Sequence, residues 1–160
     1  MTAKEEKPLH QQQQPLETDS LCWCQLLQAS VNSLFPKLSQ TQWQRLSPTT
    51  LAYLGDAIYE LYVRMYYSSP PKRSEIHHRL VVAQVRAEKQ ALHLQTLAPH
   101  LQQKELEIVR RGRNAASGGP KRVDPKIYQQ ATSFETLIGY LYLTDCQRLA
   151  ELLQKLNLEQ

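Results

Sequence analysis

The sequence predicts an all-α protein, and three observations lead to this fold class. Of the 160 residues, 41% are hydrophobic, which is enough to build a single core. The chain contains only 5 glycines, and no stretch alternates apolar and polar residues as a half-buried strand does. Apolar residues instead recur at intervals of three and four, in segments that open with a capping residue. We therefore expect a helical bundle without a sheet.

The N-terminal stretch differs in composition from the remainder of the chain. Residues 1–17 are polar and include a run of glutamines flanked by prolines, so we expect a disordered tail there. Residues 18–160 are expected to form a single domain, because their apolar residues can share one core.

Capping residues and prolines mark where the helices begin and end. Ser47-Pro48 combines a capping serine with a proline at the first helical position, and Asp124-Pro125 repeats this arrangement later in the chain. With Pro70-Pro71 and Pro99 as breaks, the sequence predicts helices over residues 20–31, 48–68, 74–97, 101–111 and 125–143, and a last one from residue 145 onward. A short segment over residues 41–46 is expected to pack Trp43 on the core.

Charge, cysteine content and hydropathy indicate which partners and which compartment the protein can have. The net charge is +4, which suits a nucleic-acid partner without establishing one. The three cysteines are an odd and sparse set that forms no disulfide framework, so we expect a reducing, cytoplasmic compartment. The sequence contains neither an apolar run of about 18 residues nor the apolar segment of a secretory signal, so no membrane association is expected.

Two acidic residues stand among apolar neighbours in two different helices. Asp56 follows Gly55 in the helix over 48–68, and Glu135 lies in the helix over 125–143, while Glu75 opens a helix between them. A carboxylate in such surroundings is costly unless something positive pairs with it. Carboxylates gathered without neighbouring cations would bind a hard divalent ion, Mg²⁺ or Mn²⁺. Pairing of each acid with a buried arginine or lysine explains the pattern equally well.

One loop combines glycine with clustered positive charge. Residues 110–126 hold six basic residues against the single acid Asp124. Glycines beside cations favour phosphate binding, although the spacing of a P-loop is absent. An ordinary surface loop is the alternative, and the density of charge favours the phosphate-binding interpretation. The six residues are Arg110, Arg111, Arg113, Lys121, Arg122 and Lys126.

Two segments resemble the signature helices of the ribonuclease III catalytic domain, a family that cuts double-stranded RNA with divalent metals. Each motif is modest alone, but the two together, in this order and at this separation, are specific. The resemblance covers residues 47–157 and implies an all-α endonuclease-domain bundle. The segments are Leu54-Gly55-Asp56-Ala57 and Phe134-Glu135-Thr136-Leu137-Ile138-Gly139.

Further residues resemble the short Mini-ribonuclease III branch of that family. Tyr53 in the first signature and the run from Arg111 to Ala115 carry this likeness, and no double-stranded-RNA-binding domain is expected after the catalytic domain. The resemblance implies a homodimer whose seam includes Tyr53 and Leu54. It also implies maturation of the precursor of large-subunit (23S) ribosomal RNA, hence a role in ribosome biogenesis, with help from a ribosomal protein.

The same resemblance assigns roles to individual residues. Asp56 and Glu135 correspond to catalytic metal ligands, and Glu75 falls near a third acidic position of the family. A bound Mg²⁺ or Mn²⁺ would activate water to attack the scissile phosphate, leaving 5′-phosphate and 3′-hydroxyl ends. The residues expected to contact RNA are Arg111, Arg113, Asn114, Lys121 and Arg122.

Two departures from the full-length family keep other functions open. Ala52 and Thr132 occupy positions where the larger relatives carry carboxylates, so the expected set of metal ligands is smaller. These departures would suit a non-catalytic, ribosome-associated RNA-binding domain of the same fold. A helical protein-interaction module, in which the acids are merely ion-paired, is a further alternative. Cleavage of duplex RNA in the presence of Mg²⁺ separates the endonuclease from the other two, and RNA binding without cleavage separates the second from the third.

Overall fold

The computed structural model describes residues 39–117, 119 and 121–158, and in these residues it is helical without a strand. This confirms the predicted fold class. The expected tail over residues 1–17 and the expected helix over residues 20–31 lie outside the described residues. The elements are α2 (Gln40–Gln44), α3 (Pro48–Tyr67), α4 (Ser74–Val85), α5 (Ala87–Leu97), the 3-10 helix η1 (Ala98–His100), α6 (Gln103–Ala115), α7 (Pro125–Thr144) and α8 (Cys146–Leu153).

The two long helices begin at the predicted caps. The Ser47 hydroxyl oxygen accepts a hydrogen bond from the Thr50 backbone N–H at 3.1 Å, directly before α3. The Asp124 carboxylate accepts one from the Lys126 backbone N–H at 2.8 Å, directly before α7. Each cap satisfies backbone donors that the first turn of a helix leaves without partners.

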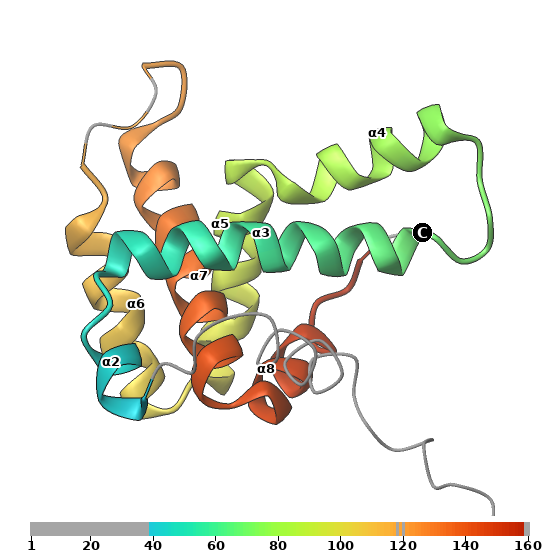
Figure 1. The fold of residues 1–160 in the computed structure, drawn as a ribbon. Helices are drawn as coiled ribbons and strands as arrows, with labels where there is room; N and C mark the ends of the chain where they lie inside the picture. The colour runs from blue at the N-terminus through green and yellow to red at the C-terminus, as the bar shows by residue number, and fades with distance from the viewer. Residues whose placement is uncertain (1–38, 118, 120, 159–160) are drawn as a thin grey trace, which may run out of the picture.

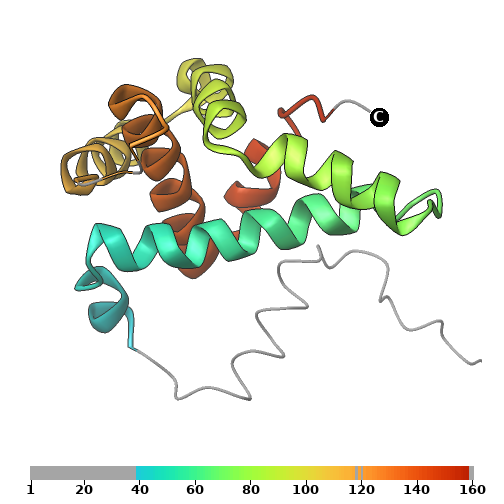
Figure 2. The same ribbon diagram turned by 90° about the horizontal axis from the view of Figure 1, so that it is seen from above.

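The single helix expected over residues 74–97 is wrong, because the chain breaks into α4 and α5 at Arg86. This residue is extended, with φ −69° and ψ 152°. The break lets α4 pack along α3 while α5 turns to pack against α7 (Figure 2). No glycine or proline marks this position, so the periodicity alone could not reveal it. The helix expected over residues 101–111 is also displaced, since α6 spans Gln103–Ala115.

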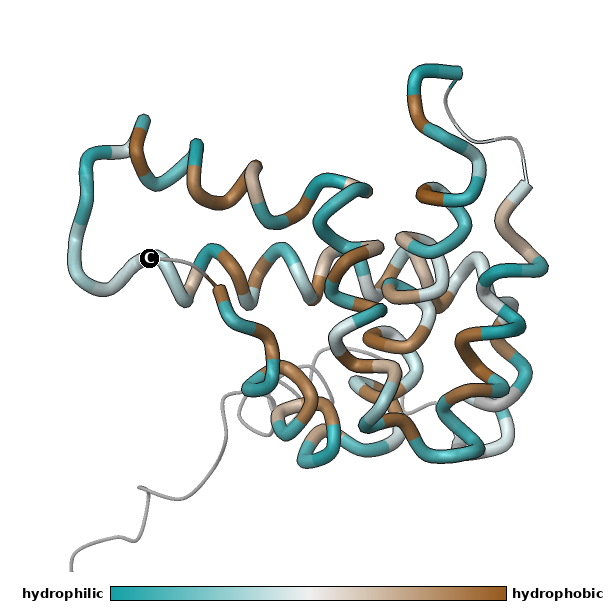
Figure 3. Tube along the Cα trace, turned by 180° about the vertical axis from the view of Figure 1, so that it is seen from behind, coloured by the Kyte–Doolittle hydropathy of each residue, from teal (hydrophilic) through white to brown (hydrophobic). Residues whose placement is uncertain are grey.

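Helix α7 is the centre of the bundle. It packs against α3, α5, α6 and α8, and crosses α3 near the start of that helix (Figure 1). Phe134, Leu137 and Ile138 on α7 are completely buried, together with Tyr59 and Val63 of α3. Polar residues interrupt the hydrophobic ones along every helix (Figure 3), and none of the described helices could span a membrane. The crossing of α3 and α7 therefore fixes the geometry of the whole core.

Candidate active site

The two acidic residues meet because α3 and α7 cross with their backbones in contact. A Cβ atom placed on Gly55 would overlap the carbonyl oxygen of Glu135, and one placed on Gly139 would overlap the carbonyl oxygen of Leu51. Only glycine allows such an approach at these positions. Asp56 follows Gly55 directly, so the close crossing brings its side chain toward Glu135.

Asp56 and Glu135 line one cavity of about 340 Å³. Its walls come from α3, from the end of α4, from α5, from α7 and from Val123 in the loop before α7. Glu135 is half-buried, whereas Asp56 remains exposed. The pairing of these two acids, expected from the sequence, is therefore present in the folded chain.

The pKa values of Asp56 and Glu135 are both raised, as expected for two acids close together without a cationic partner. Burial raises the pKa of the Glu135 carboxyl to about 7, and the charge of Asp56 raises it further. Partial burial likewise raises the pKa of Asp56, with a contribution from the charge of Glu60. Among the described residues, no ion pair involves Asp56 or Glu135. The alternative in which each acid meets an arginine or lysine is thus not realised in that part of the chain.

Gln90 of α5 is a member of this site that sequence reasoning missed. Its side chain is 1% exposed and hydrogen-bonds to the carboxylates of both Asp56 and Glu135, which lowers the pKa of each. A weak signal was available, because Gln90 shares an apolar helix face with Ala87, Ala91 and Leu94. A glutamine in such a row is unusual unless it has a buried partner.

Glu75 is not brought to the other two acids. It is exposed in the first turn of α4, whereas Val85 at the opposite end of that helix lines the cavity. Ten residues of helix separate these ends by about 15 Å. In the described residues, no three His, Cys, Asp or Glu side chains gather as a metal cluster. The prediction that Glu75 assists Asp56 and Glu135 within one chain therefore finds no support in this arrangement.

The two departures from the larger relatives lie at the site itself. Ala52 is buried beside the acid pair on α3, and Thr132 lies one turn before Glu135 on α7. Both residues line the cavity. Where the larger relatives carry additional carboxylates, this chain therefore presents a methyl group and a hydroxyl.

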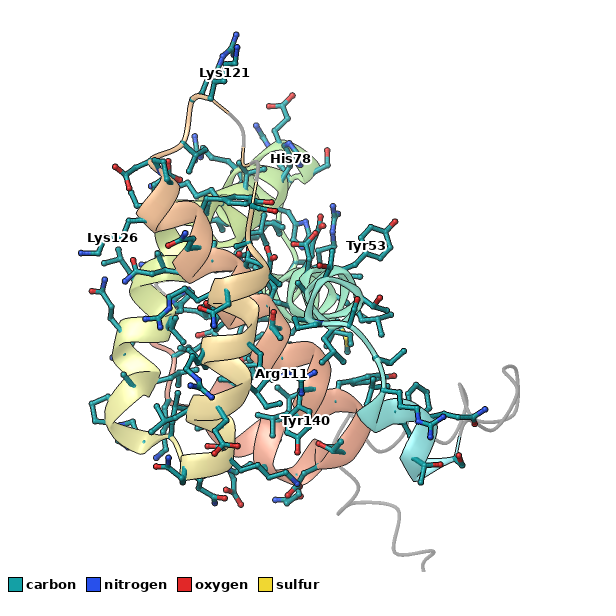
Figure 4. All side chains as sticks on the ribbon, turned by 90° about the vertical axis from the view of Figure 1, so that its left-hand side faces the viewer. Tyr53, His78, Arg111, Lys121, Lys126 and Tyr140 are labelled. Carbon is teal, nitrogen blue, oxygen red and sulfur yellow. The ribbon has the colours of Figure 1, made fainter. Side chains whose placement is uncertain are left out.

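The residues predicted to bind RNA are distributed over two regions. Lys121 and Arg122 are exposed in the loop whose next residue, Val123, lines the acidic cavity. Arg113 and Asn114 are exposed in the last turn of α6. Figure 4 shows Lys121 at the tip of its loop, and Arg111 far from it beside Tyr140.

Arg111 belongs to a second cavity, of about 450 Å³, between α2, α6 and α7. Trp43 and Tyr140 line this cavity together with Lys104, whose ammonium lies 5.7 Å above the centre of the Tyr140 ring. Arg111 is thus separated from the acid pair, and the five predicted RNA contacts do not form one compact patch.

The residues predicted for a dimer seam differ in exposure. Tyr53 is 82% exposed and projects away from α3 (Figure 4), whereas Leu54 is only half-buried. Leu61 and Met65 continue the exposed apolar row two and three turns further along α3. An aromatic side chain left in solvent in this way is typical of an interface.

The donor set fits a hard divalent cation. Two carboxylates face one cavity, no basic side chain of the described residues is ion-paired to them, and the Oε1 atom of Gln90 is buried without a hydrogen-bond donor. Oxygen ligands of this kind are those that Mg²⁺ and Mn²⁺ prefer. Such a cation would also remove the repulsion between the two acids.

Comparisons with known proteins identify the family of this chain. Residues 49–146 match the Ribonuclease III domain. The chain is 58% identical over 115 residues to Mini-ribonuclease 3 of Synechocystis, which covers 72% of this chain and 80% of that protein. It is 54% identical over 112 residues to Mini-ribonuclease 3 of Thermosynechococcus vestitus, which covers 70% of this chain and 74% of that protein.

A solved structure is also similar. The crystal structure of a protein from Fusobacterium nucleatum superposes with a TM-score of 0.62 at 30% identity, over 69% of this chain and 88% of that one. The matched domain includes both α3 and α7, and thus both acids of the cavity. The chain therefore belongs to the ribonuclease III family, and within it to the Mini-ribonuclease III branch.

Proposed function

We propose that this protein is an endoribonuclease that cleaves double-stranded RNA with the help of a divalent cation, Mg²⁺ or Mn²⁺. The observation that carries the proposal is the pair Asp56 and Glu135, held in one cavity by a glycine-mediated helix crossing without a cationic partner among the described residues. Two neighbouring carboxylates without a cationic partner repel one another, so they are suited to binding a cation rather than to stabilising the fold.

The site residues have distinct tasks in this proposal. Asp56 and Glu135 hold the cation, and the rigid crossing fixes the separation of their carboxylates. A divalent ion bound there supplies Lewis-acid stabilisation of phosphodiester oxygens and lowers the pKa of water. The exposed side of Asp56 leaves the cavity open to an RNA backbone. The products would carry 5′-phosphate and 3′-hydroxyl ends.

Recognition of the RNA would depend on its phosphates and shape. Lys121 and Arg122 extend from the loop at the edge of the acidic cavity, so they are placed to contact the backbone beside the cleaved bond. Arg113 and Asn114 are placed to contact phosphates further along the duplex, with Arg111 as a more distant contact. Because these contacts are ionic, binding should weaken steeply as the salt concentration rises.

A homodimer is part of the proposal. The exposed row of Tyr53, Leu61 and Met65 on α3 would meet the same row of a second copy, with Leu54 at its border. Tyr53 also lines the acidic cavity, so the dimer seam would lie directly beside each active site. Measuring the mass of the wild-type protein and of Tyr53→Asp in solution tests this arrangement.

The biological substrate is proposed from the family resemblance. We infer that the enzyme matures the precursor of large-subunit (23S) ribosomal RNA in the cytoplasm, and that a ribosomal protein presents the duplex to it. Support comes from the membership of the Mini-ribonuclease III branch and from the basic loop beside the cavity. Cleavage of precursor RNA, alone and as a ribonucleoprotein particle, tests the need for a protein partner.

A cleavage assay with matched variants tests the central claim. Purified full-length protein, Asp56→Asn and Glu88→Gln are incubated with duplex RNA and Mg²⁺. Glu88 is an exposed acid on α5 outside the cavity, so its variant should cleave like the wild type. Asp56→Asn should bind the RNA without cutting it. Equal cleavage by all three proteins would remove Asp56 from the site, and binding without cleavage by the wild type would indicate a non-catalytic RNA-binding domain.

A further inference from the structure

Gln90 reaches the acid pair through a specific feature of the fold. The break at Arg86 starts a new helix, and α5 then packs against α7 instead of continuing along α3. As a result Gln90 lies in the wall of the cavity that holds Asp56 and Glu135. With 1% of its surface exposed, the side chain has no access to bulk solvent.

The two ends of the Gln90 amide have different surroundings. The carboxylates of Asp56 and Glu135 are acceptors, so the hydrogen bonds that Gln90 makes with them come from its NH₂ group. The carbonyl oxygen Oε1 is buried and has no donor. A buried acceptor without a partner destabilises the fold, so its retention calls for an explanation.

A ligand for a cation provides that explanation. The site offers two carboxylates, since Ala52 and Thr132 contribute no carboxylate to the cavity. A hard divalent cation requires six or more oxygens, and amide carbonyl oxygens are among its regular ligands. The two ends of an amide group are nearly equal in size. A half-turn about the last side-chain bond would therefore place Oε1 where the NH₂ group now faces the acids.

We propose that Gln90 is a third protein ligand of the divalent cation, presenting its side-chain carbonyl oxygen beside Asp56 and Glu135. This inference rests on the proposed metal-dependent function. Without a cation, the NH₂ group bridges the two carboxylates and keeps them together. With a cation bound, the amide turns its oxygen inward and completes a set of three protein oxygens.

Metal binding without RNA tests the proposal. Calorimetric titration of Mn²⁺ is compared for the wild type, Gln90→Met and Gln84→Met. Methionine has nearly the shape of glutamine but no carbonyl oxygen. Gln84 is an equally buried glutamine whose amide donates to the Tyr67 hydroxyl at 3.1 Å, outside the cavity. We expect Gln90→Met to weaken Mn²⁺ binding about tenfold or more, and Gln84→Met to change it less than twofold.

A spectroscopic measurement separates direct ligation from mere positioning. Protein labelled with ¹³C at the glutamine side-chain carbonyl should show a ¹³C hyperfine coupling in the pulsed EPR spectrum of bound Mn²⁺. The coupling should vanish in labelled Gln90→Met and persist in labelled Gln84→Met. Weaker Mn²⁺ binding in Gln90→Met, without any such coupling in the wild type, would overturn the ligand role.

A charged replacement keeps the proposal testable even if the methionine variant does not fold. Gln90→Glu retains an oxygen at the same position and adds a charge, so it should bind Mn²⁺ at least as tightly as the wild type. Weaker binding by Gln90→Glu, or unchanged binding by Gln90→Met, would overturn the proposal. Failure of the wild type to bind Mn²⁺, or equal binding by Asp56→Asn, would instead overturn the proposed function itself, and the ligand role with it.

Discussion

Two glutamates of this protein are withdrawn from solvent in opposite electrostatic surroundings. Glu105, 3% exposed on α6, receives the Arg148 guanidinium at 2.8 Å and the Gln102 backbone N–H at 2.7 Å. Burial alone would raise the pKa of Glu105, but these partners outweigh it and hold the pKa below its usual value. Glu135 faces Asp56 and Gln90 instead, and its pKa rises to about 7.

The difference in pKa between Glu105 and Glu135 follows from whether the fold supplies the acid with a cationic partner. The charge of Glu105 is neutralised by an arginine of α8, 43 residues away along the chain. The same bundle leaves Glu135 beside a second carboxylate without an ion-pair partner among the described residues. Since the chain can neutralise a buried acid, we attribute the uncompensated pair to the cation site proposed above.

Neutralising Glu135 should produce the largest effect on function. We expect Glu135→Gln to reduce cleavage of duplex RNA roughly 10⁴-fold, equivalent to about 5 kcal/mol of transition-state stabilisation. In the metal-free protein the same change should stabilise the fold, because it removes one of two repelling charges. Single-turnover cleavage and thermal unfolding in chelator measure the two effects. Glu88→Gln, an exposed acid of α5 outside the cavity, is the control and should change neither. A loss of stability in Glu135→Gln would contradict the view that Glu135, unlike Glu105, lacks a partner that stabilises its charge.

Removing the partner of the structural acid should have the next largest effect. Arg148→Met leaves Glu105 buried without its cation, so we expect a loss of about 3–4 kcal/mol in the free energy of unfolding. Urea titration measures this loss. In the double variant Glu105→Gln/Arg148→Met the loss should be smaller, because no buried charge remains. Equal destabilisation in the single and double variants would show that the ion pair contributes little beyond packing.

The two acids of the site and the starts of the two long helices could be predicted from the sequence. Asp56 and Glu135 stand out in the sequence because each is an acid in an otherwise apolar helical row, which is a local signal, whereas their role as metal ligands is implied only by the family resemblance. The caps at Ser47 and Asp124 are local too, and the structure confirms the helices that they start. These features need no knowledge of which helices touch.

Other features of the molecule depend on contacts between distant segments, and the sequence did not predict them. Gln90 joins the site only because the chain breaks at Arg86, where no glycine or proline announces a turn. The ion pair of Glu105 with Arg148 links helices that the periodicity cannot place relative to one another. The family resemblance sets Glu75 near a third acidic position, yet the length of α4 carries it away from the cavity within one chain. Pairwise helix packing decides all three cases.

The helix crossing itself can be altered to separate the two acids. Gly139→Ala places a methyl group on the Leu51 backbone carbonyl, which cannot move without shifting α3. We expect a loss of about 2–3 kcal/mol in the free energy of unfolding, together with weaker Mn²⁺ binding, because the carboxylates no longer keep their separation. Thr144→Ala, at the exposed end of α7, serves as the control and should stay within about 0.5 kcal/mol. Destabilisation without any change in Mn²⁺ binding would show that the crossing does not set the ligand geometry.

The smallest expected effect is the pH dependence of the metal-free protein. The pKa of Glu135 rises from 4.5 to about 7 on folding, so the folded state holds a proton that the unfolded state releases. The free energy of unfolding should therefore fall as the pH rises from 4.5 to 7, by about 1–2 kcal/mol for this half-buried group. Glu105 has the opposite sign, since its lowered pKa gives stability that is lost as the pH falls. Urea titrations of the wild type and Glu135→Gln in chelator isolate the first contribution, and adding Mg²⁺ should reduce it. A wild-type curve parallel to that of Glu135→Gln would mean that Glu135 is already ionised near pH 5, and that the acid pair has a cation that this comparison has missed.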